Sequence, residues 1–324
     1  MKEDNLIKLK GALKEHIWGG TKIHDVLHKD TGDKTNVAES WEISTHPDGQ
    51  SIIDSGKYSG KTLNEYFDSI GWGKLGEYSA KFRQLPVMVK YIDATGDLSI
   101  QVHPDDEYAR IHENDSGKNE IWFIVGAEKD AFIYLGFSRN VTREEVVEHI
   151  NAGTLAGLLN KVHVKRGEVF YIPAGTVHAI GKGCLICEIQ QSSNVTYRVF
   201  DYGRLGLDGK PRELHIDKAL DVMNFGKYAV KKTRAGNIDD LGEYFNSLFA
   251  GHVQCGLFKY EAKGEFNYSH SRRCISFAIT YKGKGLISCN SAVSKTEVGD
   301  TWLLNGRSIK ISGKCKVIIM SLWG

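Results

Sequence analysis

The sequence predicts an all-β fold with small helical insertions. Short segments rich in β-branched and aromatic residues follow one another closely, and Gly, Pro, Asp or Asn bounds most of them, as expected for strands joined by turns. Helical periodicity is clear in only two places. Many short strands at this spacing favour a β-sandwich or barrel over alternating strand–helix units.

The clearest strand patterns lie in the first two thirds of the chain. They are PVMVKYIDA, LSIQVHP, EIWFIV, AFIYLGF, GEVFYIP and CLICEIQ, at 86–94, 98–104, 120–125, 131–137, 167–173 and 184–190. A second group of strand patterns follows near the end of the chain. It consists of LFKYEA, CISFAITY, GLISC, DTWLLN and KVIIMSLW.

Two segments have helical spacing instead. KTLNEYFDSIG (61–71) is amphipathic and ends at a glycine. TREEVVEHINAGTLAGLLN (142–160) begins with Thr142 and Glu145 at the spacing of a capping box. Asp105 and Asp106, after a His-Pro pair, favour the N-terminus of a further short helix because carboxylates are stabilised there.

The 324 residues have room for roughly two domains. A polar stretch at about 228–248 predicts a connection, so we expect one domain at 1–225, with a helical insertion at about 142–160, and a second at 226–324. A weak internal repeat supports this division, because 166–189 aligns without a gap with 298–321. In that alignment His178 falls opposite Lys310, so we expect the second domain to be a degenerate copy without the chemistry.

Composition and charge argue against several function classes. The net charge is only +2 and the basic residues are scattered, so we expect no nucleic-acid partner. No segment approaches the ~18 consecutive apolar residues of a membrane span. The charged N-terminus lacks the apolar stretch of a signal peptide, so we expect a cytoplasmic protein. An exposed sheet edge could support a homodimer.

Six cysteines in a chain of this length do not make a disulfide scaffold. Cys184 and Cys187 form a CxxC pattern, but they lie within an apolar strand pattern. Residues three apart on a strand point to opposite faces. We therefore expect buried, reduced thiols there and neither a redox pair nor a shared metal.

Four polar residues suggest a metal site. Gln101 and His103 alternate with apolar residues, so on a strand they share the face opposite to the apolar pair. Glu120 begins the next clear strand, and His178 follows a Pro-x-Gly turn. Two imidazoles, a carboxylate and an amide oxygen suit an open site for Zn²⁺ or Fe²⁺.

The pattern becomes more specific when GEVFYIPAGTVH (167–178) is taken as a unit. Its glycines, proline and histidine stand at the fixed positions of the second signature of the cupin superfamily, which it resembles, although the usual terminal Asn is absent. The first cupin signature has His-x-His followed closely by Glu. Here it is Gln101-Val-His103, and Glu120 comes later. QVHP followed by Lys118-Asn119-Glu120 resembles the class I mannose-6-phosphate isomerases.

Further segments extend this resemblance over most of the chain. WGG (18–20), AESWEIS (38–44) and QQSSNVTYRVFDYGR (190–204) are similar to motifs of the bacterial short form of the family. The chain lacks the long helical insertion of the fungal and enterobacterial forms. The resemblance therefore implies two cupin jelly rolls, the first catalytic and the second degenerate.

The resemblance also implies roles for individual residues. It implies one zinc ion per chain, held by His103, Glu120, His178 and Gln101. It makes Arg198 the catalytic arginine and sets Lys118 at the pocket wall, where it would bind substrate or transfer a proton. Glu188, which alternates with apolar residues on its strand, is a further candidate for substrate contact.

The family's reaction interconverts mannose 6-phosphate and fructose 6-phosphate through a cis-enediol, so the implied partner is a sugar phosphate. A divalent ion and a guanidinium would stabilise the negative charge that grows on oxygen. The proton-transfer base stays open among Lys118, Glu188 and a zinc-bound water.

Two alternative functions also stay open. A non-haem Fe(II) dioxygenase is one, because two histidines and a glutamate also suit Fe²⁺. Gln101 in place of a histidine argues against it, as do the Lys-x-Glu pattern and Arg198, which suit an anionic sugar. A non-catalytic cupin that only binds a sugar phosphate is the other.

Overall fold

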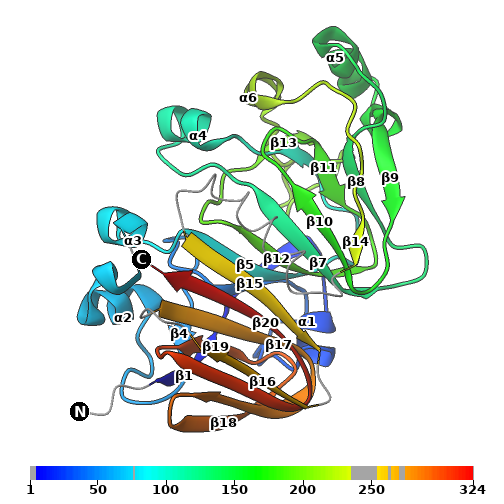
Figure 1. Ribbon diagram of the computed structural model, residues 1–324. Coiled ribbons are helices and arrows are strands. Elements are labelled where there is room, and N and C mark those ends of the chain that lie inside the picture. Colours follow the sequence, from blue (N-terminus) through cyan, green and yellow to red (C-terminus); the bar gives the residue numbers. More distant parts are fainter. Residues whose placement is uncertain (1–4, 76, 235–253, 262–263, 270–273, 324) are drawn as a thin grey trace.

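The computed structural model describes residues 5–75, 77–234, 254–261, 264–269 and 274–323. These residues form three antiparallel sheets with a few short helices at their edges (Figure 1). The predicted all-β fold is confirmed. Among the described residues, no helix combines the length and apolarity of a membrane span.

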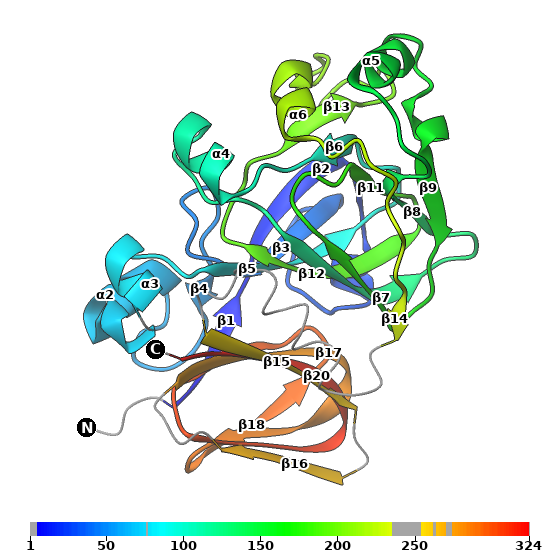
Figure 2. The same cartoon turned by 45° about the horizontal axis from the view of Figure 1, so that its top comes forward.

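Two of the sheets face each other and form the first jelly roll (Figure 2). The larger has the strand order β14, β10, β7, β12, β5, β3, β2, with bounds Thr233–Arg234, Glu168–Ile172, Glu120–Ala127, Cys184–Gln191, Val87–Asp93, Val37–Ile43 and Ala12–Gly20. The smaller has the order β13, β6, β11, β8, β9, with bounds Tyr197–Phe200, Ile100–Val102, His178–Ile180, Phe132–Phe137 and Leu159–His163. All six strand patterns expected in this part of the chain are present.

The third sheet contains most of the described C-terminal residues. Its order is β15, β20, β17, β19, β1, β4, with bounds Gln254–Glu261, Ser308–Trp323, Cys274–Cys289, Thr301–Leu304, Leu6–Lys10 and Ile52–Ile53. At its margins β16 (Gly264–Ser269) pairs with β20, and β18 (Ala292–Glu297) pairs with β17. Two N-terminal strands therefore belong to this sheet, and β1 enters it with Leu6 opposite Leu304.

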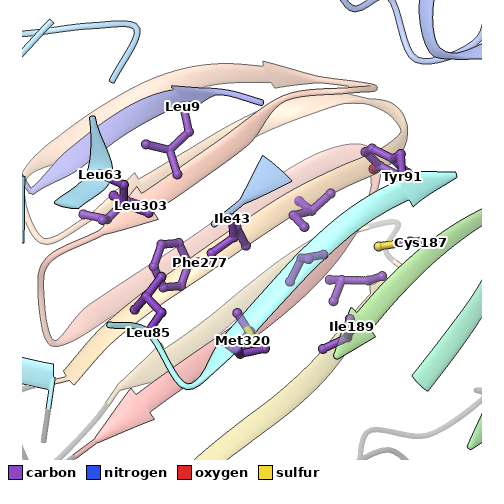
Figure 3. Close-up of a cluster of buried hydrophobic side chains, with 14 of the residues drawn as sticks. Leu9, Ile43, Leu63, Leu85, Tyr91, Cys187, Ile189, Phe277, Leu303 and Met320 are labelled. Carbon is purple, nitrogen blue, oxygen red and sulfur yellow. The ribbon is translucent and has the colours of Figure 1, made fainter. Parts of the chain in front are cut away.

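The seven-stranded sheet separates two hydrophobic cores. Cys187 of β12 lies in one cluster with Phe277 and Met320 of the third sheet (Figure 3). Ile186, one residue earlier, lies in the cluster between the seven-stranded and five-stranded sheets. Because strand side chains alternate, Glu188 shares the face of Ile186 and points into the jelly roll. The same alternation in β7 turns its even-numbered residues, from Glu120 on, toward that interior.

Each of the two segments expected to be helical contains a capped helix. Thr62 caps α2 (Leu63–Ile70) in a reciprocal capping box, and the helix ends at Gly71, whose φ of 92° suits glycine. Thr142 caps α5 (Arg143–Asn151) by accepting the backbone N–H of Glu145. The carboxylate of Glu145, however, pairs with Arg139 and does not complete the box.

The remaining helices are short. They are α1 (Lys22–Asp25), η1 (Trp72–Leu75), α3 (Glu77–Phe82), α4 (Asp106–His112), η2 (Leu155–Leu158) and α6 (Ile216–Val222). Asp105 caps α4 by accepting the backbone N–H of Tyr108 at 2.9 Å, as expected. The predicted insertion at 142–160 is interrupted after α5 and ends at η2, because β9 already begins at Leu159.

Two details differ from the sequence-based expectation. The patterns at 274–281 and 285–289 belong to one continuous strand, β17, which passes a bulge between Thr280 and Lys282. The predicted connection at 228–248 contains β14, and its residues from 235 on lie outside the described part of the chain. Cys184 and Cys187 are buried free thiols in different clusters, as predicted.

Candidate metal centre and active site

Three strands bring the predicted ligands together. Gln101 lies in β6 opposite His178 of β11, and His103 follows directly after the end of β6. Glu120 is the first residue of β7. One ligand atom each of His103, Glu120 and His178 lies within 4.8 Å of the others, and all three side chains are buried.

The distances within this cluster are short. Nε2 of His103 lies 3.1 Å from Oε1 of Glu120, and Nε2 of His178 lies 3.6 Å from Oε2 of Glu120. The amide nitrogen of Gln101 lies 3.4 Å from Nε2 of His178. A glutamine ligand would present its oxygen instead, which a flip of the amide brings to the same position.

Hydrogen bonds to backbone carbonyls determine which imidazole nitrogen is protonated. Nδ1 of His103 donates to the Val195 carbonyl at 3.0 Å, and Nδ1 of His178 donates to the Thr176 carbonyl at 2.8 Å. A carbonyl can only accept, so both protons reside on Nδ1 and both Nε2 lone pairs face Glu120. This arrangement is typical of metal-binding histidines.

The protonation states also suit a cation. Burial lowers the pKa of His103 to about 3, with a further contribution from the positive charge of Lys118, and burial lowers the pKa of His178 as well. Both rings are therefore neutral near pH 7, the form that binds metals. Burial opposes ionisation of Glu120, but Lys118 and the two histidines hold its pKa well below the usual range.

The buried Oε1 of Glu120 accepts no hydrogen bond of acceptable geometry from the described residues. Lys118 contacts it electrostatically, with Nζ at 2.9 Å. Two oriented imidazole lone pairs and an ionised carboxylate with an unsatisfied oxygen form the donor set of a two-histidine, one-carboxylate metal site. The residues present therefore fit a divalent ion.

A cavity of about 280 Å³ opens beside this cluster. Gln101, Lys118, Glu188 and Arg198 all line it, so the structure brings every predicted site residue either into the cluster or to the cavity wall. Lys118 is buried, with Nζ also 3.2 Å from Nε2 of His103. Arg198 lies in β13 opposite Gln101.

Arg198 and Glu188 bring different chemical properties to the cavity wall. One terminal nitrogen of Arg198, Nη1, donates to the Glu213 carbonyl at 2.8 Å, and its buried Nε has no hydrogen-bond partner among the described residues. Burial and the charge of Glu120 raise the pKa of Glu188 to about 7. The cavity wall therefore combines a fixed positive charge with a carboxyl group that can exchange a proton near neutral pH.

Four further residues of the site were not singled out by the sequence analysis: Glu39, Lys90, Trp122 and Arg212. The indole nitrogen of Trp122 donates to Glu120 at 3.0 Å and to Glu188 at 2.8 Å. Lys90 Nζ lies 3.7 Å from Glu39 and 3.8 Å from Glu188. Arg212 lines the cavity together with Arg198. Alternation in β7 could have indicated Trp122, which shares the face of Glu120.

Comparison with known proteins identifies the family. Residues 6–127 match the model of the type I phosphomannose isomerase catalytic domain. The chain is 36% identical to mannose-6-phosphate isomerase ManA of Bacillus subtilis over 325 residues, which cover 97% of this chain and 98% of the relative. This chain belongs to the mannose-6-phosphate isomerase family. The resemblance noted in the sequence is thereby confirmed, and the protein is an enzyme of this family.

Other relatives and solved structures agree. The probable mannose-6-phosphate isomerase GmuF of the same bacterium is 34% identical, over 96% of this chain and 97% of its own length. The crystal structure of the Bacillus subtilis mannose 6-phosphate isomerase has a TM-score of 0.84 and 31% identity, and the match covers 98% of this chain and 99% of that one. A mannose 6-phosphate isomerase structure with bound zinc and yttrium shares the fold, at a TM-score of 0.72 and 16% identity, over 99% of this chain and 100% of that one.

Proposed function

We propose that this chain is a zinc-dependent aldose–ketose isomerase that interconverts mannose 6-phosphate and fructose 6-phosphate through a cis-enediol. The observation that carries the proposal is the buried cluster of His103, Glu120 and His178 beside a polar cavity. Family membership supplies the sugar-phosphate substrate class. It also favours the isomerase over the dioxygenase and non-catalytic alternatives.

The ion would be held by Nε2 of His103, Nε2 of His178 and the carboxylate of Glu120, with Gln101 as the fourth ligand. Zn²⁺ suits imidazole and carboxylate ligands and keeps a position open in catalytic sites. When bound, it supplies a Lewis acid for the negative charge that develops on the sugar oxygens. We expect one ion per chain.

Arg198 supplies a second, permanent positive charge. A guanidinium stays protonated at any working pH, although burial lowers the pKa of Arg198 below its ordinary value. Its Nε has no other partner among the described residues and is therefore free to donate to substrate oxygen. Arg212, on the same cavity wall, offers a second guanidinium that can bind the substrate phosphate.

Proton transfer between C1 and C2 needs a group that gains and loses a proton near neutral pH. Glu188, with its pKa raised to about 7 by burial and by Glu120, meets this requirement. Burial works against the charged form of Lys118, but the charges of Glu120 and Glu188 outweigh it and raise the lysine's pKa. We therefore assign proton transfer to Glu188 and substrate binding and charge stabilisation to Lys118.

The test is an assay of mannose 6-phosphate conversion, with fructose 6-phosphate as the measured product and metal content determined on the same sample. We expect turnover that a chelator abolishes and that added Zn²⁺ restores. Bound metal without turnover of this sugar would overturn the proposal. The cytoplasmic location, the homodimer, the absence of a nucleic-acid partner and the division at residue 225 stay predictions.

A further inference from the structure

His103 and His178 are oriented in different ways. The partner of His178 is the carbonyl of Thr176, only two residues earlier in the chain. The partner of His103 is the carbonyl of Val195, ninety-two residues later. The orientation of His103 therefore depends on the segment 192–196, which joins β12 to β13 and which we call the strap.

Ser193 connects the strap to a neighbouring loop. Its hydroxyl accepts the backbone N–H of Val195 at 3.2 Å and donates to Oδ2 of Asp115 at 3.2 Å. A hydroxyl has one donor and two acceptor positions, so it can make both bonds at once. The backbone N–H of Asn194 also points to Oδ2 of Asp115, at 3.4 Å.

Asp115 lies outside the active-site cavity. It lines an open groove on the outer side of the strap, and its side chain is about one fifth exposed. Its other oxygen, Oδ1, accepts the backbone N–H of Ser116 at 2.7 Å, and Nε2 of His46 lies 3.8 Å from Oδ2. Because the segment 115–120 also contains Glu120, it supplies one ligand and contacts the strap that orients another.

We propose that Asp115 is a positioning residue for the metal centre, because through Ser193 it holds the Val195 carbonyl that orients His103. The inference rests on the proposed function, whose metal site it deepens. Asp115 contacts neither a ligand side chain nor the cavity, and Ser193→Ala distinguishes an effect through the strap from one through the segment 115–120.

The geometry predicts what an isosteric change would do. Oδ2 accepts from the Ser193 hydroxyl and the Asn194 amide, and Oδ1 accepts from the Ser116 amide. In Asp115→Asn, one of these positions becomes an NH₂ group that faces a donor. With NH₂ at the Oδ2 position the strap faces a donor, and with NH₂ at the Oδ1 position it keeps only a neutral acceptor, which binds more weakly than a carboxylate. Ser193→Ala interrupts the same connection at its middle.

The experiment measures the zinc affinity of metal-stripped protein by competition with a chromophoric chelator. Partners of metal-bound histidines typically contribute 10–100-fold in affinity. Since Asp115 acts through an intervening residue, we expect about a 10-fold loss in Asp115→Asn, the lower end of that range. Ser193→Ala should lose a similar factor, and the double variant should lose no more affinity than the single variant with the larger loss, because both changes interrupt one connection.

Glu113→Gln is the matched control. Glu113 lines the same groove and carries the same charge, but its carboxylate accepts from Tyr197 and Lys218 and makes no bond to the strap. We expect its zinc affinity to equal that of the wild type. The absorption spectrum of the Co²⁺-loaded protein should change in the Asp115 and Ser193 variants and not in this control.

The possible failures are distinguishable. Wild-type zinc affinity in both Asp115→Asn and Ser193→Ala would overturn the inference, as would an equal loss in Glu113→Gln. A lower thermal midpoint of the metal-free protein with unchanged zinc affinity would also overturn it, because that result indicates a purely structural role. A wild-type chain that binds no zinc at all would overturn the proposed function itself.

Discussion

Replacing Trp122 by phenylalanine removes a single donor from the centre of the site. The indole is fully buried, and its N–H is shared between Oε2 of Glu120 and Oε2 of Glu188. Its ring also meets His178 edge to face, at 5.3 Å between centroids. Phenylalanine keeps an aromatic ring in the core and leaves both carboxylates without this donor.

The expected effect is a higher pKa for Glu188. A hydrogen bond to a charged group contributes about 1.5–3 kcal/mol, and a pKa shift of one unit corresponds to about 1.4 kcal/mol. The loss of the whole bond would therefore raise the pKa by about one to two units. Because Glu120 shares the N–H, we expect an upward shift of about one unit.

The assay is the pH dependence of kcat/KM for mannose 6-phosphate. Since Glu188 must be ionised to accept the proton, the acidic limb should move to higher pH by about one unit. Phe170→Leu is the control, because Phe170 is the buried neighbour of Trp122 across the strands and has no polar atom. It should lower stability without moving the limb. An unchanged acidic limb in Trp122→Phe would refute the assignment of proton transfer to Glu188.

Three further predictions test the remaining parts of the site. His178→Ala removes a ligand, so zinc affinity should fall by more than about 100-fold, the upper limit for residues that only orient a ligand. Turnover should be lost as well, and a competition titration measures the zinc affinity. Arg198→Ala should still bind zinc, but its kcat should fall by about 10²–10³-fold because the site loses one charged hydrogen-bond donor. Steady-state kinetics on protein of known metal content measures this. In metal-free protein, burial lowers the pKa of folded His103 from 6.5 to about 3, so the unfolded chain takes up the proton first as pH falls. Stability should therefore decline between pH 6.5 and 3 by up to about 5 kcal/mol in urea unfolding, and His103→Gln should remove that part of the decline.

The local sequence pattern was sufficient to predict most strands and both capped helices. It was insufficient where distant segments pair. Nothing near Leu6 indicates that it will lie opposite Leu304, because that contact joins the two ends of the chain and depends on packing in the core of the third sheet. The sequence patterns at 274–281 and 285–289 predict two separate strands, with Gly283 between them and Gly285 at the start of the second. In the structure Gly285 pairs with Gly313 across a close backbone approach, so the glycines lie within a continuous strand.

The ligand residues could be predicted because their chemistry lies in the side chains and their spacing follows strand alternation. The residues that support them could not be found in this way. Val195 orients His103 through its backbone carbonyl, which any residue type has. Arg212 reaches the cavity through the folding of a long connection after β13. A single sequence shows which groups are present, whereas these contacts depend on how the chain returns to the site.

The most direct test of the metal assignment is a zinc titration of the metal-stripped chain, with turnover of mannose 6-phosphate measured at each addition. If His103, Glu120 and His178 hold one catalytic ion, activity should start near zero, rise in proportion to added zinc and stop rising at one ion per chain. Glu120→Gln should give no such rise. Full activity of the metal-free chain, or activity that does not follow zinc occupancy, would contradict the assignment.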